Sequence, residues 1–143
     1  MHLEISRSDY VSMLAAAQKA APCEACGLLA GQNGKVFKLY ELTNADASPE
    51  HFSMIPEEQF AALKDMRANG IEMLAAWHSH PATPARMSAE DLRLAYAPGL
   101  IHLILSLAFP GQPQIRAFVV EDGCAREIDL TITGSKSEEK NDE

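Results

Sequence analysis

Two histidines separated by a single residue, His78 and His80, are the side chains of this sequence best placed to do metal chemistry. A β-strand alternates its side chains with a period of two, so both imidazoles would point to one face while Ser79 faces away. The apolar run 73–77 before them is typical of a strand, and Pro81 lacks the N–H that the next ladder position needs. The pattern predicts a strand that ends at His80, with two rings close enough to hold one ion.

Ser88 and Asp91 follow in a run that predicts a helix over 88–96, with Ser88 as its N-cap. The positive end of the helix dipole favours an ionised carboxylate there, by about 0.3 to 1 kcal/mol. Alone, these two residues would be an ordinary capping box. With the histidines they complete a set of two imidazoles and one carboxylate, which Zn²⁺ accepts while leaving a fourth position to water. This is the chemistry of hydrolysis, although Fe²⁺, Co²⁺ and Mn²⁺ accept the same ligands.

A hydrolytic metal site also needs a general base. No glutamate adjoins the first histidine, as one does in the H-E-x-x-H proteases, so the base must come from elsewhere in the chain. Glu24 leads an apolar strand, where partial desolvation would raise its proton affinity. Glu90 adjoins Asp91, but neighbouring residues on a helix point about 100° apart, so we expect Glu90 at the surface. The residues alone leave other glutamates open, among them Glu41, Glu50, Glu57, Glu58 and Glu72.

The order of these residues resembles the JAMM metallopeptidases of the Mov34/MPN/PAD-1 group. The motif of that family is an upstream glutamate, H-x-H, ten residues and an aspartate, and ten residues separate His80 from Asp91 here. The segment 22–31 is similar to the one that carries the family's glutamate, and 51–56 is similar to the stretch before its central helix. The resemblance therefore extends over most of the chain.

The resemblance implies a role for each residue of the set. His78, His80 and Asp91 would bind one zinc ion. Glu24 would bind and deprotonate the metal-bound water, and Ser88 would donate a hydrogen bond to the tetrahedral oxyanion. A hydroxyl that is held in place as a helix cap suits this role, because an oxyanion donor should not reorganise during the reaction.

The resemblance also implies a substrate class. Family members cleave peptide or isopeptide bonds beside the C-terminal diglycine of ubiquitin or ubiquitin-like proteins. Only nine residues separate Asp91 from Ile101, which leaves no room for a long insertion that would clamp a second ubiquitin. We therefore expect a bacterial sulfur-carrier protein, or its conjugate, as the substrate and partner. The alternative is a non-catalytic MPN-type scaffold that binds a protein partner, but such scaffolds usually lack metal ligands and this chain has all three. The oligomeric state is left open.

Cys23 and Cys26 form a C-x-x-C pair around Glu24. The pair matches half of a zinc nucleobase deaminase motif, but there an H-x-E precedes the cysteines, whereas here an H-x-H follows them. A redox or metal-binding role is possible in principle for such a pair. We expect instead that Cys26 packs as a small apolar residue in its strand, that Cys23 lies at the mouth of that strand, and that Cys124 is structural.

The rest of the chain predicts alternating helices and strands. Asn33-Gly34 is a strong hairpin signal, Ser8 can cap the first helix, and Phe60, Leu63 and Met66 are spaced for one buried face of the second. His102 lies within a strand and is expected to be packed or hydrogen-bonded, while His2 and His51 show no partner pattern. The strands are expected over 3–5, 26–30, 35–42, 73–80, 101–107, 114–120 and 126–133, and the helices over 8–20, 56–68 and 88–96.

These elements predict an α/β (α+β) fold with a mostly antiparallel, partly curled sheet flanked by helices. The resemblance implies the same fold, MPN/JAMM-like and related to that of cytidine deaminases. A chain of 143 residues suits one domain, expected over 1–133, and the polar, charged segment 134–143 is expected to be disordered.

Composition narrows the partners and the compartment. The net charge of −8 disfavours nucleic acid and anionic membranes, because phosphate binding depends on clustered Lys and Arg. No apolar run approaches the ~18 residues of a membrane span, and no targeting segment is evident. Three cysteines fit a reducing compartment. The sequence therefore predicts a cytoplasmic protein.

Overall fold

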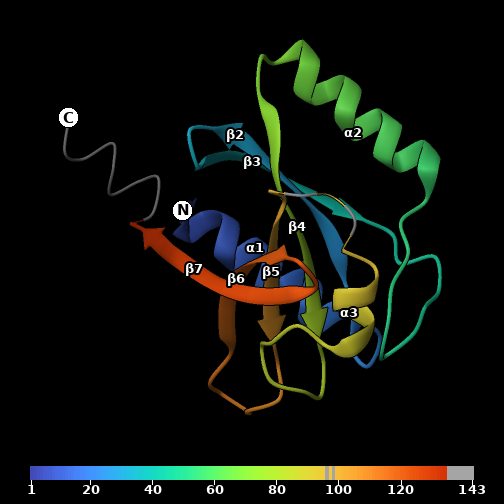
Figure 1. Ribbon diagram of the computed structural model, residues 1–143. Helices are drawn as coiled ribbons and strands as arrows, with labels where there is room; N and C mark the ends of the chain where they lie inside the picture. Colours follow the sequence, from blue (N-terminus) through green and yellow to red (C-terminus); the bar gives the residue numbers. More distant parts are fainter. Residues whose placement is uncertain (96, 98, 135–143) are drawn as a thin grey trace.

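The strands form a closed barrel in the order β1-β3-β2-β4-β5-β6-β7 (Figure 1). The computed structural model describes residues 1–95, 97 and 99–134. Within them the elements are β1 (His2–Ser6), α1 (Arg7–Ala20), β2 (Cys26–Gln32), β3 (Lys35–Leu42), α2 (Pro56–Ala68), β4 (Glu72–His80), α3 (Ala89–Arg93), β5 (Ile101–Ser106), β6 (Gln114–Glu121) and β7 (Cys124–Thr133). Every helix and strand predicted from the sequence is present.

The sheet is mostly antiparallel, as predicted, but it closes instead of curling only partly. The pairs β2·β3, β2·β4, β5·β6 and β6·β7 are antiparallel. Closure comes from β1, which pairs in parallel with β7 along its whole length and with β3 through Glu4 and Lys35. The remaining parallel pair, β4·β5, aligns His78 with Ile104. Because β1 covers both outer strands of what would otherwise be an open sheet, no long edge is left unpaired there.

The main hydrophobic core fills the inside of the barrel. Alternate residues of β4, Ala75 and Trp77, join this core together with Leu3 and Leu103, and Met13 of α1 packs against them. Gly27 makes room for the indole of Trp77, because a Cβ at Gly27 would lie 2.4 Å from the indole nitrogen. From Ala75 to the end of β4, the odd positions thus face the core, and the even positions, which include both histidines, face outward.

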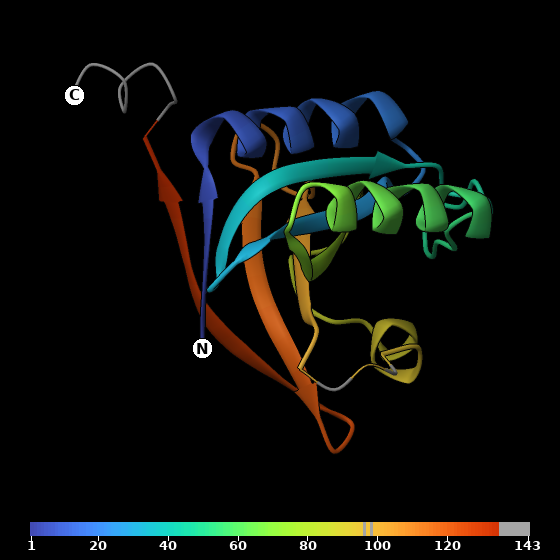
Figure 2. The ribbon, with the colours of Figure 1, turned by 90° about the horizontal axis from the view of Figure 1, so that it is seen from above.

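The second helix covers part of the outer surface of the barrel (Figure 2). Its Ala62 and Met66 pack against Leu28 and Ala30 of β2. The predicted buried face of this helix was wrong at two of three positions: Met66 is buried, but Phe60 is 69% exposed and Leu63 is 45% exposed.

The orientation of α2 has a polar cause. Asp65 accepts hydrogen bonds from the Lys38 ammonium at 2.5 Å and from the Tyr40 hydroxyl at 2.6 Å, both on β3. These bonds turn the Ala62 and Met66 side of the helix toward the sheet. Apolar spacing within the helix could not reveal them.

The ends of two helices differ from the predicted ones. Ser6, not Ser8, caps α1, since its hydroxyl accepts the N–H of Asp9 at 3.0 Å and the helix begins directly after β1. α3 ends at Arg93 instead of continuing to residue 96, which lies outside the described residues. Leu94 is the C-cap, and its N–H donates to the Glu90 carbonyl at 3.1 Å as the last bond of the helix.

The predicted hairpin turn is confirmed, and the prediction of a disordered tail stays untested. Asn33 and Gly34 both have positive φ, 53° and 76°, as a two-residue hairpin turn requires. The segment expected to be disordered falls, from residue 135 on, outside the described residues. Among the helices of the described part of the chain, none is long and apolar enough to cross a membrane.

Candidate metal centre

His78 and His80 lie at the end of β4, on the outer face of the barrel, and each is 3% exposed. Ser79 between them points inward and is fully buried. Its hydroxyl accepts the N–H of Ala25 at 2.7 Å, and its own N–H donates to the Ala25 carbonyl at 2.9 Å. The alternation predicted from the sequence therefore places both rings on one side and ties the strand end to the residue after Glu24.

Asp91 reaches the two rings from the first turn of α3. Ser88 and Asp91 form a reciprocal capping box, in which the Ser88 hydroxyl accepts the N–H of Asp91 at 3.0 Å and the Asp91 Oδ2 accepts the N–H of Ser88 at 2.9 Å. This pair of bonds fixes the rotamer of the carboxylate. Because both hydrogen bonds of the capping box hold the first turn of α3, the Asp91 carboxylate has little conformational freedom.

The three side chains bring three donor atoms into a compact triangle. The Nε2 atoms of His78 and His80 are 3.1 Å apart, and the Oδ2 of Asp91 lies 3.2 Å from the first and 3.1 Å from the second. A tetrahedral zinc ion with bonds of about 2.0 to 2.1 Å separates its ligand atoms by about 3.3 Å. The residues therefore fit one such ion without rearrangement, and in the described part of the chain they form the one group of this kind.

The protonation states of His78 and Asp91 suit ligation, whereas His80 has to give up a proton to bind a metal ion. Burial lowers the pKa of His78, so its ring is neutral at neutral pH. Burial also acts to lower the pKa of His80, but hydrogen bonds with Asp91 and with the Pro84 carbonyl outweigh it and raise that pKa. Because a carbonyl can only accept, the Nδ1 of His80 is the donor to Pro84 at 3.0 Å, which leaves its Nε2 facing the triangle. Burial acts to raise the pKa of Asp91, yet its bonds to both histidines hold that pKa well below the ordinary value.

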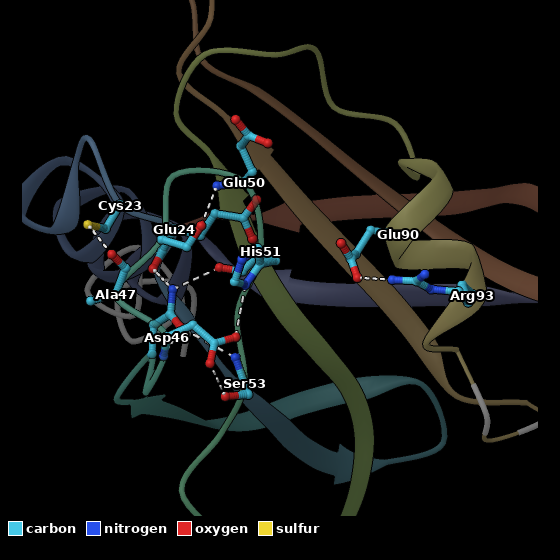
Figure 3. Close-up of polar contacts among 11 residues, drawn as sticks. Cys23, Glu24, Asp46, Ala47, Glu50, His51, Ser53, Glu90 and Arg93 are labelled. Atoms are coloured by element: carbon cyan, nitrogen blue, oxygen red, sulfur yellow. Dashed lines mark hydrogen bonds and ion pairs between the residues drawn. The ribbon is translucent and has the colours of Figure 1, made fainter.

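Glu24 stands just before β2, is 3% exposed, and its Oε1 has no hydrogen-bond partner in the described residues. Burial raises the pKa of this carboxyl to about 7; nearby His80 acts to lower it and Asp91 to raise it. The raised proton affinity agrees with the sequence-based expectation for this residue. Figure 3 shows Glu24 next to the loop that carries Glu50 and His51, with Glu90 on the helix across from them.

This raised pKa predicts a pH-dependent stability for the metal-free protein. A carboxyl with a higher pKa in the folded state binds more protons when folded, so stability falls as the pH rises from 4.5 to about 7. Each pKa unit is worth about 1.4 kcal/mol, so Glu24→Gln should stabilise the protein by up to about 3 kcal/mol above neutral pH and by much less in acid. Urea unfolding of both proteins with a chelator, at several pH values, measures this. A difference that does not change with pH would contradict it.

Two clefts meet at the triangle. The polar cleft is lined by Glu24, Glu50, His80, Ser88, Glu90 and Arg93. The apolar cleft lies on the side of His78 and Asp91, and its other walls include Leu28, Phe52, Met54, Met73 and Leu100. The walls of both clefts are largely apolar, but the polar cleft places the charged side chains of Glu24, Glu50 and Arg93 along one side of any extended chain that passes over the triangle.

Glu90, expected at the surface, borders both clefts and forms an ion pair with Arg93. Its side chain is 38% exposed, so the pair faces solvent at the rim of the site.

His102 is half-buried at the apolar cleft, and its Nε2 has no hydrogen-bond partner in the described part of the chain. The structure does not bring His102 or His2 into the triangle.

Three contributors near the triangle were not found from the sequence. The ring of Phe52 stacks on His78, with centroids 4.8 Å apart and an interplanar angle of 29°. His51 pairs with Asp46 at 2.9 Å, and the Asn44 amide bonds to the backbone of Glu24. The similarity of 51–56 to a family segment was the one sequence signal for His51 and Phe52, and Asn44 had none, because loop contacts leave no periodic pattern.

The cysteines are all free and none joins the triangle, although Cys26 is the register partner of His78 across the β2·β4 pair. Cys26 is buried in β2, as predicted, and burial raises the pKa of its thiol to about 12, which disfavours a metal-binding thiolate. Cys23 donates to the Ala47 carbonyl at 3.2 Å at the mouth of the strand. Cys124 was expected to be structural, but it is exposed at the start of β7.

Comparison with known proteins gives three kinds of match. Residues 6–120 match the family described as prokaryotic homologues of the JAB domain. The chain is 31% identical to the CysO-cysteine peptidase of Mycobacterium tuberculosis, over 92% of both chains.

Two solved structures are similar in fold. One is the solution structure of a protein from Desulfitobacterium hafniense, with 47% identity, 94% of each chain covered and a TM-score of 0.85. The other is a JAB1/MPN domain protein from Archaeoglobus fulgidus, with 24% identity, 92% of this chain and 99% of that chain covered, and a TM-score of 0.62. The second likeness bears on the fold alone, and it confirms the fold class predicted from the sequence.

Proposed function

The chain belongs to the prokaryotic JAB-domain family, and on that premise we propose that it is a zinc-dependent peptidase acting on a ubiquitin-like sulfur-carrier protein. The bond cleaved is the peptide or isopeptide bond after the carrier's C-terminal diglycine. The observation that carries the proposal is the triangle of His78, His80 and Asp91 atoms, with edges of 3.1 to 3.2 Å, beside the buried Glu24.

The metal would be held by His78, His80 and Asp91. Two neutral imidazoles and one carboxylate are donors that zinc accepts, and the single negative charge leaves the ion most of its positive charge. When bound, zinc supplies Lewis acidity that polarises a carbonyl and lowers the pKa of a nearby water. We propose one zinc ion for each chain.

Glu24 is the proposed general base and acid. With a pKa of about 7, its carboxylate can take a proton from water near neutral pH and return it to the leaving amine. Because Glu24 lines the polar cleft, the leaving amine departs on that side. The carrier's tail then lies in the apolar cleft, across the triangle from the amine.

Ser88 is the proposed oxyanion donor. Its hydroxyl oxygen accepts the N–H of Asp91, so its own hydrogen is free to donate to a substrate carbonyl. Ser88 borders the same polar cleft as Glu24 and His80. The capping bond keeps the hydroxyl in place before the reaction starts.

The buried triangle gives a physical reason for a diglycine. Because His78 and His80 are each only 3% exposed, a scissile carbonyl has to approach the protein surface closely to reach an ion held between them. Residues without side chains can approach that closely, whereas larger ones would collide with the walls. The similarity to a CysO-cysteine peptidase supports a carrier bearing a small C-terminal adduct as the substrate.

The test is mass spectrometry of sulfur-carrier conjugates incubated with the purified protein. We expect cleavage after the diglycine, loss of cleavage with a chelator, and recovery when zinc is restored. Zinc-loaded protein that binds a carrier conjugate without cutting it would contradict the proposal and favour the non-catalytic scaffold.

A further inference from the structure

We propose that Asn44, which no step of the proposed reaction uses, is a positioning residue that holds Glu24 in place over the metal centre; this inference rests on the proposed function. Asn44 follows the end of β3. Its Nδ2 donates to the Glu24 carbonyl at 3.0 Å and to the His51 carbonyl at 3.1 Å. Its Oδ1 accepts the N–H of Asp46 at 3.0 Å and that of Ser53 at 3.3 Å. All four hydrogen-bonding positions of this one amide are therefore occupied.

Glu24 depends on such contacts because it lies outside the sheet. β2 begins at Cys26, so no ladder partner fixes the backbone of Glu24. Instead its N–H donates to the Ser48 carbonyl at 2.8 Å, its carbonyl accepts from Asn44, and the next N–H, that of Ala25, donates to the Ser79 hydroxyl. The Ser79 hydroxyl and Asn44 hold the same peptide group, between Glu24 and Ala25, and Asn44 is the tether on its carbonyl side.

The same amide also orders the loop that covers His78. The residues that Asn44 joins, Glu24, Asp46, His51 and Ser53, come together in Figure 3. Asp46 completes the loop by accepting from the Ser53 hydroxyl and pairing with His51, each at 2.9 Å. Phe52, between His51 and Ser53, stacks on the ring of His78. Asn44 thereby links the position of the proposed base to that of a proposed metal ligand.

Asn44 lies outside the two clefts that meet at the triangle, among the residues the structure describes. It lines a separate cleft with Glu24, Cys23 and Thr43, to which the proposed reaction assigns no part of the substrate. Loss of the two N–H donors of Asn44 should therefore lower the rate of the chemical step more than it weakens substrate binding. A misplacement of about 1 Å can lower a rate by about 100-fold, which sets the expected size of the effect on kcat.

The Asn44→Asp variant removes the N–H donors of the side chain and keeps its oxygen acceptor. An aspartate keeps both acceptors for Asp46 and Ser53 but has no N–H to donate to Glu24 or His51. Asn69→Ala is the matched control, since it also removes a side-chain bond to a backbone carbonyl, that of Asp65 at 2.7 Å, but at the end of α2. Carrier-conjugate cleavage is measured for each protein per bound zinc, together with zinc affinity, thermal unfolding and, in the metal-free proteins, hydrogen exchange of the Ala25 amide.

We expect Asn44→Asp to lower kcat by about 100-fold with little change in KM or zinc content, and to speed exchange of the Ala25 amide. Asn69→Ala should lose stability but keep its kcat and its Ala25 protection. Asn44→Asp that cleaves at the wild-type kcat per zinc would overturn the inference, whatever its thermal stability. Wild-type protein that binds zinc but cleaves no conjugate would instead overturn the proposed function, so the two failures are distinct.

Discussion

Glu24→Gln should lower kcat by about 10²- to 10⁴-fold while the protein stays folded and keeps its zinc, because that is the usual contribution of a general acid–base group. The amide has nearly the shape of the carboxylate but cannot take a proton from water. It also removes the buried carboxyl whose pKa burial raises to about 7, so folding should not suffer. Steady-state cleavage of a sulfur-carrier conjugate, with zinc content measured on the same samples, gives the result.

Glu50→Gln is the matched control for this substitution. Glu50 borders the same polar cleft, but it is exposed and belongs to the loop rather than to the entry of β2. We expect Glu50→Gln to keep most of the wild-type kcat. A large loss in Glu50→Gln together with an active Glu24→Gln would show that the base has been assigned to the wrong glutamate.

His78→Ala should weaken zinc binding by more than about 100-fold. Loss of a residue that only orients a ligand lowers metal affinity by about 10- to 100-fold, and loss of a ligand itself should exceed that range. The two remaining donor atoms, on His80 and Asp91, are 3.1 Å apart and cannot define a three-ligand site. Competition with a chelator of known affinity measures the change.

His102→Ala is the control for the histidine. His102 is on β5 beside Ala76, two residues before His78 in the strand register, and lies outside the triangle. Its removal should leave zinc affinity nearly unchanged. If His102→Ala lost zinc and His78→Ala kept it, the ligand set proposed for the site would be wrong.

The parts of this site that follow local rules could be predicted from the sequence. The period of a strand places His78 and His80 on one face, and the reciprocal hydrogen bonds of Ser88 and Asp91 are those of a capping box. Asn33 and Gly34 form a hairpin turn because both residue types tolerate the positive φ that the turn requires. Each of these features involves neighbours in the chain, where spacing carries the information.

Features that depend on distant contacts could not be predicted in this way. The barrel closes through β1 and its two parallel partners, which the residues of β1 do not reveal. The exposed side of α2 is set by Asp65 through Lys38 and Tyr40, against the apolar spacing of Phe60 and Leu63.

The assignment of Glu24 as the base, among several glutamates, also depends on contacts between distant segments. Desolvation could be expected at the entry of an apolar strand, but equally good positions exist elsewhere in the sequence. What distinguishes Glu24 is its burial beside His80 and Asp91, which bring charge to it from β4 and α3. The hydrogen bonds of Asn44 and the stacking of Phe52 on His78 likewise join segments that spacing alone does not connect.

X-ray absorption spectroscopy at the zinc edge, on purified protein whose zinc content has been measured, tests the metal centre most directly. We predict one zinc ion per chain, with only nitrogen and oxygen neighbours at about 2.0 to 2.1 Å and a signature of imidazole scattering that is lost in His78→Ala. Protein that takes up no zinc, or a spectrum with sulfur at about 2.3 Å, as ligation by Cys23 and Cys26 would produce, would contradict the account.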